Sequence, residues 1–497
     1  MNAYAQLEAR FRRISALDDA ARLLGWDMQV NMPPGGADAR AEQMTAMKLT
    51  IREKVTDPAV ANLLAEAETG QGALDDWQRA NLREMRRRVV HATAVPADLV
   101  EASTRATSKC HMAWREARPK SDFALVRKEL EEVVRLTRQG AEARAAATGL
   151  SPYEALMELY EPGARTDRID AIFAELAREL PPIVDAVLER QASQPAPHEP
   201  EGPFPVEAQR RLGERFMRTL GFDFHHGRLD ETLHPFCSGV PEDMRVTSRW
   251  DDRHFFDGLM AVLHETGHAL YEMGRPKDWR HQPVGNARGM AMHESQSLLM
   301  EMQACRSREF LGFAAPILAE EFGGSGPAWH PENVYRLYTR VARSLIRVDA
   351  DEVTYPLHVI LRYRLERAML AGDLAVADLP GAFREAMTSL VGIEPPDDRR
   401  GCLQDIHWYS GSIGYFPTYT LGAAAAAQLF AAARKAKPEI PDALAKGDFA
   451  PLLAWLRESV HSKGSSKMTD EILAEATGKP LDTAAFMTHL KARYLAN

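Results

Sequence analysis

Five consecutive residues, His264 to His268, carry the clearest chemical signal in the sequence. They read HETGH, which matches the pattern H-E-x-x-H. Residues four apart lie on one face of a helix, so His264 and His268 would offer two imidazoles to one metal ion. Glu265 would stand beside them and accept the proton of an attacking water. This arrangement is typical of zinc metallopeptidases.

The residues around the motif predict a helix. Apolar side chains recur at near-helical spacing from Phe255 to Met273, and Gly274 and Pro276 supply a stop. The alternative is a chance match on an ordinary core helix, because a long chain with sixteen histidines meets the pattern by accident in a small fraction of cases. A third ligand is therefore needed to favour a metal site.

Glu294 is the expected third ligand, since catalytic zinc sites use three protein ligands and keep one position open. It lies in GMAMHESQSLLMEM, 26 residues after His268 (294 − 268), on an otherwise apolar run where an unpaired carboxylate would be costly. The alternative is a solvated Glu294, exposed together with His293 and Gln296. Glu272 is a weaker rival, because it follows the motif on the same helix and would have to bend back.

The composition is that of a globular protein. Of 497 residues, 45% are hydrophobic and 26% charged, and 61 basic and 70 acidic residues give a net charge of −9. This balance argues against a nucleic-acid partner and leaves ample length for a large core. No uncharged apolar run reaches about eighteen residues, and the nearest, 421–433, is too short to cross a membrane.

The N-terminus and the cysteines predict a cytoplasmic protein. The first residues, MNAYAQLEARFRR, lack the apolar stretch of a signal peptide. The cysteines are scattered without a C-x-x-C pair, which fits a reduced compartment. They are Cys110, Cys237, Cys305 and Cys402.

The pattern along the chain predicts a predominantly α-helical fold with one small β ribbon. Long amphipathic helices are expected over 1–150, and the pattern is helical again from 251 to the end. Partial alternation predicts the ribbon within 224–250. The Pro-rich segment 191–205 fits a linker and a surface loop equally well.

Two further segments carry residues suited to binding a substrate. In LIRVDADEVTY, 345–355, Arg347 would clamp a carboxylate with its forked guanidinium, and its apolar neighbours predict a packed helix. Asp349 and Asp351 would either orient Arg347 or consume it in a structural ion-pair network. In the Gly-broken segment 401–422, a Tyr hydroxyl or His N–H would donate to the oxyanion of the scissile carbonyl, or the rings would simply pack. The candidates there are His407, Tyr409, Tyr415 and Tyr419.

The segments HPFCSG and DMRVTSRW precede the metal motif. His234 would line the cleft or serve only packing. For Asp243, Arg245 and Arg249 a structural ion-pair brace is the favoured interpretation.

The ordered series of these motifs resembles the thermostable carboxypeptidase family of the carboxypeptidase Taq type. The series runs HPFCSG, DMRVTSRW, HETGH, HESQ, IRVDAD and GCLQDIHW, followed by GYFPTY. The early WDMQVNMPPGGADARAEQ and YEALMELYEPG and the tail EATGKPLDTAAF also resemble that family. The resemblance therefore extends over nearly the whole chain, with no departure at the metal or base positions.

The resemblance implies a largely helical, saddle-like single catalytic unit over 1–497 with a deep groove, similar to neurolysin and angiotensin-converting enzyme. An N-terminal helical part would extend to about 200, and a metal-site part would follow from about 201. The activity would be metal-dependent removal of single C-terminal residues from peptides, with broad preference but poor cleavage after Pro. The protein would be an intracellular homodimer.

The resemblance also implies roles for particular residues. One divalent ion per chain is expected, zinc first, with cobalt or manganese as alternatives. Carried over by motif, the ligands are His264, His268 and Glu294, and the base is Glu265. The anchor for the substrate carboxylate would be Arg347, and the substrate-binding or oxyanion groups would be His407 and Tyr415.

Two other functions are also compatible with the sequence. An oligo-endopeptidase with the same type of groove would cut internal bonds, so it would keep cutting a peptide whose C-terminus is amidated. A helical binding protein with a structural metal would show no turnover, and the intact Glu265 argues against it.

Overall fold

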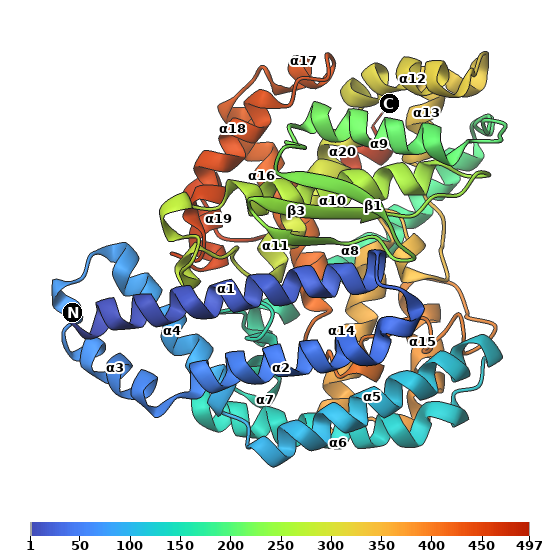
Figure 1. Ribbon diagram of the computed structural model, residues 1–497. Coiled ribbons are helices and arrows are strands. Elements are labelled where there is room, and N and C mark those ends of the chain that lie inside the picture. Colours follow the sequence, from blue (N-terminus) through green and yellow to red (C-terminus); the bar gives the residue numbers. More distant parts are fainter. Residues whose placement is uncertain (1, 497) are drawn as a thin grey trace.

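The computed structural model describes residues 2–496, and helices make up most of them (Figure 1). The predicted all-α class with a small β element is confirmed. Nine α-helices precede the sheet in the described chain, and the first six of them lie within 1–150, where the apolar spacing predicts helices. They are α1 (Ala3–Val30), α2 (Ala37–Thr56), α3 (Pro58–Thr69), α4 (Asp76–Thr93), α5 (Ala97–Lys120), α6 (Ala124–Thr148), α7 (Pro152–Met157), α8 (Thr166–Ala192) and α9 (Val206–Leu220).

Local sequence explains where several of these helices begin. Asn2 caps α1 by accepting the N–H of Ala5 at 2.9 Å. Ser151 caps α7 in a reciprocal capping box with Glu154, and Pro152 occupies the first helical position, as the Ser-Pro pair predicts. The side chains that satisfy these helix ends are thus supplied by the residues next to them.

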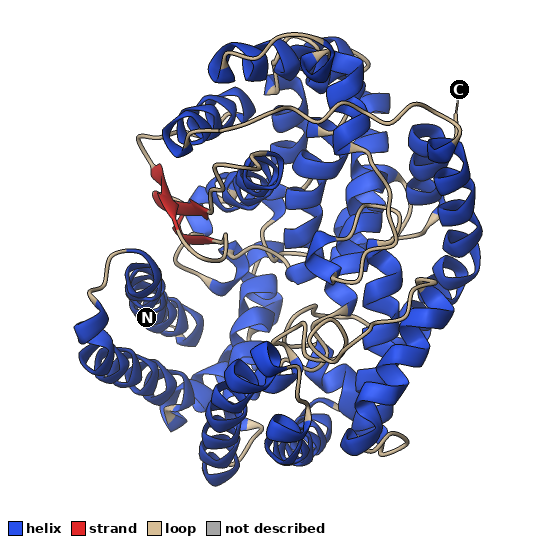
Figure 2. Ribbon diagram, turned by 90° about the vertical axis from the view of Figure 1, so that its right-hand side faces the viewer, coloured by secondary structure: helices blue, strands red, loops and turns tan. Residues whose placement is uncertain are grey.

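Eleven α-helices follow the sheet in the described chain, and they include both helices that carry the HETGH and HESQ motifs. Figure 2 shows the strands at one edge of a molecule otherwise built from helices. The eleven are α10 (Phe256–Gly274), α11 (Met290–Leu298), α12 (Arg308–Phe322), α13 (Pro331–Tyr338), α14 (Tyr355–Ala371), α15 (Leu379–Leu390), α16 (Pro417–Ala436), α17 (Ile440–Leu444), α18 (Ala450–Ser459), α19 (Thr469–Thr477) and α20 (Ala484–Tyr494).

The predicted ribbon is a three-stranded sheet of β1 (Gly227–Glu231), β2 (Cys237–Val240) and β3 (Asp243–Ser248). The strand order is β1-β3-β2, with β1 parallel and β2 antiparallel to the central β3. Apolar residues of β1 and β3 pack with residues of α9 and α10 in one small cluster. The sheet therefore lies directly against the helix that carries the metal motif.

The buried apolar side chains form two larger clusters. One joins residues from Cys110 to Tyr494 and includes Leu263 and Leu270 of α10 and Leu298 of α11. The other lies among the first four helices, between Ala3 and Val89. Within residues 2–496, none of the helices combines the length and apolar character needed to span a membrane.

Candidate metal centre and catalytic site

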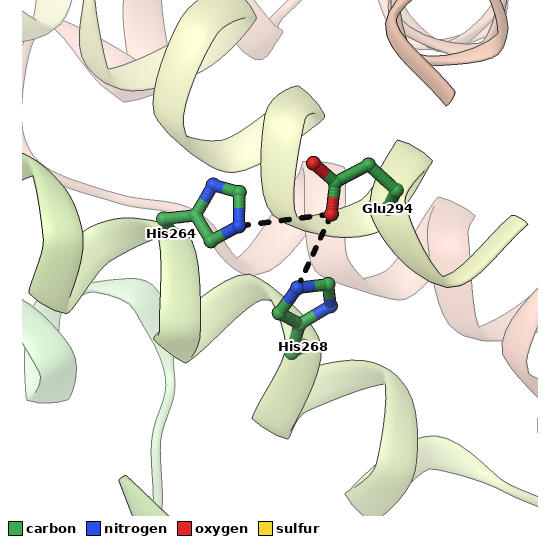
Figure 3. A group of neighbouring side chains, drawn as sticks. All are labelled: His264, His268 and Glu294. Carbon is green, nitrogen blue, oxygen red and sulfur yellow. Dashed lines mark ion pairs between the residues drawn. The ribbon is translucent and has the colours of Figure 1, made fainter. Parts of the chain in front are cut away.

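Helices α10 and α11 bring the three predicted ligands together. Glu294 Oε2 lies 3.7 Å from His264 Nε2 and 3.4 Å from His268 Nε2 (Figure 3). One ligand atom from each residue lies within 4.8 Å of the other two. Two histidines one turn apart on α10 and one carboxylate on the facing α11 thus converge on one point, as the spacing predicts.

Two glycines allow the backbones to come this close. A Cβ atom at Gly267, inside the HETGH motif, would lie 2.6 Å from the carbonyl oxygen of Gln296 on α11. A Cβ atom at Gly422 on α16 would lie 2.8 Å from Cβ of Glu294. Real Cβ atoms do not approach so closely, so a larger residue at either position would push α11, and Glu294 with it, out of place.

Both imidazoles are oriented through the nitrogen that faces away from Glu294. His264 Nδ1 lies 2.9 Å from Glu301 Oε2, and Glu301 in turn accepts a hydrogen bond from Arg306 at 2.6 Å. His268 Nδ1 lies 2.6 Å from His293 Nδ1 and 3.1 Å from the carbonyl oxygen of His293. Since each Nδ1 has an acceptor, the proton of the neutral ring belongs there and the Nε2 lone pair points toward Glu294.

This geometry fits a cation. Two Nε2 lone pairs and a carboxylate oxygen converge with no donor between them, which requires either a proton or a metal ion. Burial lowers the pKa of His264, yet Glu294 and Glu301 outweigh burial and raise it to about 10 when no metal is bound. Burial opposes ionisation of Glu294, but the two imidazoles hold its pKa at about 2. The donor set of two nitrogens and one oxygen is one that divalent zinc accepts.

Glu265 lies next to the triad but is free of partners. Its side chain is 9% exposed, and no hydrogen bond of its carboxylate is found within residues 2–496. Burial raises its pKa, while His268 and His264 oppose that rise. A carboxylate that is not held by other groups can accept a proton and release it again.

The rival acid Glu272 is occupied elsewhere. It accepts from His293 Nε2 at 2.9 Å and forms an ion pair with Arg275 at 3.2 Å. Burial opposes its ionisation, but Arg275 and then His293 hold its pKa low. Glu272 therefore contributes to the site indirectly, by fixing His293, whose ring nitrogen Nδ1 and backbone oxygen orient His268.

The two acids give a direct test of the ligand set. Replacing Glu294 with alanine removes one of the three proposed metal ligands. Metal affinity is therefore expected to fall by at least about tenfold, since even the loss of a residue that only hydrogen-bonds to a ligand has an effect of that size. Glu272→Ala is the matched control, as a half-buried acid near the same histidines, and is expected to keep about one equivalent of metal. Metal content after dialysis against a mild chelator measures both. Retention by Glu294→Ala together with loss by Glu272→Ala would mean that Glu272 is the ligand.

Arg347 lies in a short 3-10 turn, Arg347–Asp349, and the predicted packed helix is wrong. Distant side chains hold this backbone, since the Arg347 N–H donates to Gln404 Oε1 at 2.8 Å. Val348, expected to pack, is 66% exposed. β-Branched residues such as Ile346 and Val348 are poor helix formers, so the long-range contacts determine the conformation.

The guanidinium of Arg347 is buried against a residue that sequence reasoning did not single out. Asp405 accepts from Arg347 Nε at 3.1 Å and Nη2 at 2.8 Å, and from Arg362 Nε at 2.6 Å. The two expected partners are not the ones used, because Asp351 instead accepts backbone N–H groups such as that of Val353. Two guanidiniums and one carboxylate leave one net positive charge in this cluster.

Aromatic side chains of the segment 401–422 lie beside Arg347 and Arg362. Tyr419 OH lies 3.2 Å from His407 Nε2, and the Arg347 guanidinium stands 4.8 Å over the Tyr419 ring. Tyr415 packs edge-on against Tyr419 with ring centroids 5.2 Å apart. Burial raises the pKa of both tyrosines, with Glu294 among the charges that add to it. Both hydroxyls therefore stay protonated and lie within electrostatic reach of the triad.

Tyr409, the third tyrosine considered, is structural. Its side chain is fully buried, its hydroxyl donates to the carbonyl oxygen of Cys402 at 3.0 Å, and its ring stacks on Trp114. The neighbouring His407 is half-buried, and burial, followed by the charge of Arg347, lowers its pKa to about 4. His407 is therefore neutral near pH 7.

The loop that carries His407 and Tyr415 rests on one buried carboxylate. Glu366 accepts hydrogen bonds from the indole N–H of Trp408 at 3.1 Å, from the backbone N–H of Gly414 at 3.1 Å and from the hydroxyl of Tyr153. It is fully buried, and burial raises its pKa to about 7 against these three donors. Glu366 thus fixes both ends of the loop segment between Trp408 and Gly414.

Of the candidate residues that precede the metal motif, only two form the predicted ion pair. His234 is exposed in the loop between β1 and β2, and no contact of its side chain with the triad is found in the described chain. Asp243 and Arg245 form the expected brace at 2.6 Å. Arg249 is exposed and takes no part in that pair.

Similarity to known proteins extends over nearly the whole chain. Residues 6–494 match the family described as Carboxypeptidase Taq (M32) metallopeptidase. The chain is 35% identical to thermostable carboxypeptidase 1 of Pyrococcus furiosus, covering 99% of this chain and 98% of the relative. It is 36% identical to thermostable carboxypeptidase 1 of Thermus thermophilus, with coverage of 99% and 98%. The solved structure of metallocarboxypeptidase 1 of Trypanosoma cruzi is similar with a TM-score of 0.97 and 42% identity, over 99% of each chain.

Proposed function

Because the chain belongs to the carboxypeptidase Taq (M32) metallopeptidase family, we propose that it removes single amino acids from the free C-termini of peptides. The observation that carries this proposal is the triad of His264, His268 and Glu294, with the unpartnered and buried Glu265 beside it. The chain matches relatives named carboxypeptidase over nearly their whole length. This supports the proposed activity over that of an oligo-endopeptidase, which cuts internal bonds.

The triad would hold one divalent ion. Two imidazoles and one carboxylate favour zinc, and cobalt and manganese are the alternatives. When bound, such an ion supplies a Lewis acid that polarises a carbonyl oxygen and lowers the pKa of a water. Glu301 and the His293 carbonyl keep the two histidine rings in the tautomer that binds a metal.

The chain's own groups perform the remaining steps. Glu265 accepts the proton of the attacking water and returns it to the leaving amine. The hydroxyl of Tyr415, or of the adjacent Tyr419, donates to the oxyanion that forms from the scissile carbonyl, since both hydroxyls are protonated. Arg347 supplies the positive charge that recognises the terminal carboxylate, and His407 helps to align the peptide.

The cellular setting is part of the proposal. The four cysteines are free, and three of them are buried, which supports a reducing compartment such as the cytoplasm. We propose that the protein acts there as a homodimer on peptides. We propose that His234 contacts the substrate when the exposed loop between β1 and β2 closes over a bound peptide.

Amidation of the substrate tests the proposed activity. The metal-replete protein is expected to release the last residue from a short peptide with a blocked N-terminus and a free C-terminus. The same peptide with an amidated C-terminus is expected to stay intact, because it lacks the carboxylate that Arg347 recognises. Mass spectrometry of the products reads both. Internal cleavage of the amidated peptide would favour an oligo-endopeptidase, and no turnover of either peptide would favour a structural metal.

A further inference from the structure

The N-terminus of α11 is held by a turn from a distant part of the chain. The backbone N–H of Met290 donates to the carbonyl oxygen of Tyr160 at 2.7 Å, and that of Ala291 donates to Glu161 Oε2 at 2.7 Å. These are the first two helical positions of α11, whose N–H groups have no partner inside the helix. The residue before the helix is Gly289, which has no side chain to cap it.

The fit between this turn and the helix is close. Gly289 adopts φ +25°, and a Cβ atom there would lie 2.2 Å from Glu161 Oε2. The other carboxylate oxygen, Oε1, accepts the hydroxyl of Thr469, the first residue of α19. Glu161 therefore joins three segments that are more than a hundred residues apart.

Glu161 occupies this place at an energetic cost. Its side chain is 5% exposed, and in the described chain it has no ion-pair partner. Arg288, one of the two arginines whose charge lowers the pKa of Glu161, pairs instead with Glu84 at 3.0 Å. Burial raises the pKa of Glu161, and the contacts with Thr469 and Ala291 oppose that rise. Its hydrogen bonds to the helix end are thus what keeps a carboxylate in this position.

We propose that Glu161 is a positioning residue for the metal ligand Glu294. The capped Ala291 precedes Glu294 by one turn of a nine-residue helix, which then continues as the π-helix Leu299–Cys305. A helix this short depends on its ends for its orientation. Gly422 of α16 packs closely against Glu294 and the Ala291 carbonyl oxygen, so we expect a loss of the cap to displace the carboxylate relative to His264 and His268.

This inference rests on the proposed metal site, and it is tested on the full-length apoprotein with Zn²⁺ and Co²⁺ alone. Glu161→Ala removes the cap, and we expect Zn²⁺ affinity, measured by competition with a chromophoric chelator, to fall on the order of tenfold. The visible spectrum of bound Co²⁺ is expected to shift, because the Glu294 oxygen is displaced. Glu161→Gln is expected to retain affinity within about threefold, since its amide oxygen still accepts the Ala291 N–H.

Two further variants separate positioning from simple structural support. Thr469→Val breaks the contact with α19 but leaves the cap on α11, so metal affinity is expected to stay within about twofold. Glu161→Asp keeps the charge but shortens the side chain, so it is expected to bind Zn²⁺ more weakly than Glu161→Gln. This pair decides the question even if Glu161→Ala fails to fold.

Several results would overturn the inference. A lowered melting temperature in Glu161→Ala with unchanged Zn²⁺ affinity and Co²⁺ spectrum would make Glu161 merely structural. Equal weakening by Thr469→Val and Glu161→Ala would place the effect in α19, and Glu161→Asp binding better than Glu161→Gln would make charge rather than reach decisive. If His264→Ala binds Zn²⁺ as tightly as the wild type, the metal site itself is wrong, which is a separate failure.

Discussion

Replacing Glu265 with glutamine is expected to lower kcat by at least about 10²-fold, the usual scale for a general acid–base group. Glutamine has the same shape but cannot accept the proton of the attacking water. Glu265 is 9% exposed, and its carboxylate makes no hydrogen bond within the described chain, so replacing it leaves no partner unsatisfied. Fold and metal content are therefore expected to be unchanged. Turnover of a blocked peptide by the zinc-loaded variant, with metal content determined on the same sample, measures the effect.

Glu272→Gln is the matched control for this experiment. Glu272 is a half-buried glutamate two turns further along α10, and it is bound to His293 and Arg275 rather than free. We expect its loss to change kcat by less than about tenfold, because it acts only through the orientation of His268. Near-normal turnover in a metal-loaded Glu265→Gln variant would show that another group accepts the proton.

The helices and the triad were predictable because their signals are local. Capping residues such as Ser151 stand next to the helix that they cap, and apolar spacing identifies α10 without knowledge of its neighbours. His264 and His268 share a face by helix geometry alone. Glu294 was expected because a carboxylate in an apolar segment needs a partner. The structure brings these three residues together, and their role as ligands is a prediction that the Glu294 variant tests.

The residues that surround the triad were not predictable in the same way. Glu301 follows Glu294 by seven residues, yet the intervening chain enters a π-helix whose geometry the sequence does not reveal. Asp405 reaches Arg347 from 58 residues away, and its partnership depends on how two loops pack. The wrong helix around Arg347 has the same origin, because contacts with Gln404 and Asp405 override local preference.

Replacing Arg347 with alanine is expected to lower kcat/KM by about 10²- to 10³-fold on a peptide with a free C-terminus, the range for loss of a buried charge contact. The cluster of Arg347, Arg362 and Asp405 carries one net positive charge, and removing Arg347 neutralises it. A terminal carboxylate would then meet no compensating charge. The same variant is expected to lose its preference for free over amidated C-termini. Rates on both peptides, for both proteins, give the comparison.

Arg362→Ala separates substrate recognition from structural support. Arg362 pairs with the Asp405 carboxylate as Arg347 does, but it is 1% exposed and so is not available to a substrate. Its removal neutralises the cluster just as the loss of Arg347 does, and it leaves Arg347 held by Asp405. If Arg347 contacts the substrate directly, the Arg362 variant should be less stable to heat yet still reject amidated peptides. If the charge of the cluster acts only at a distance, both variants should lose that rejection equally. Persistence of the rejection in Arg347→Ala would instead remove Arg347 from the substrate site and leave it as a structural partner of Asp405.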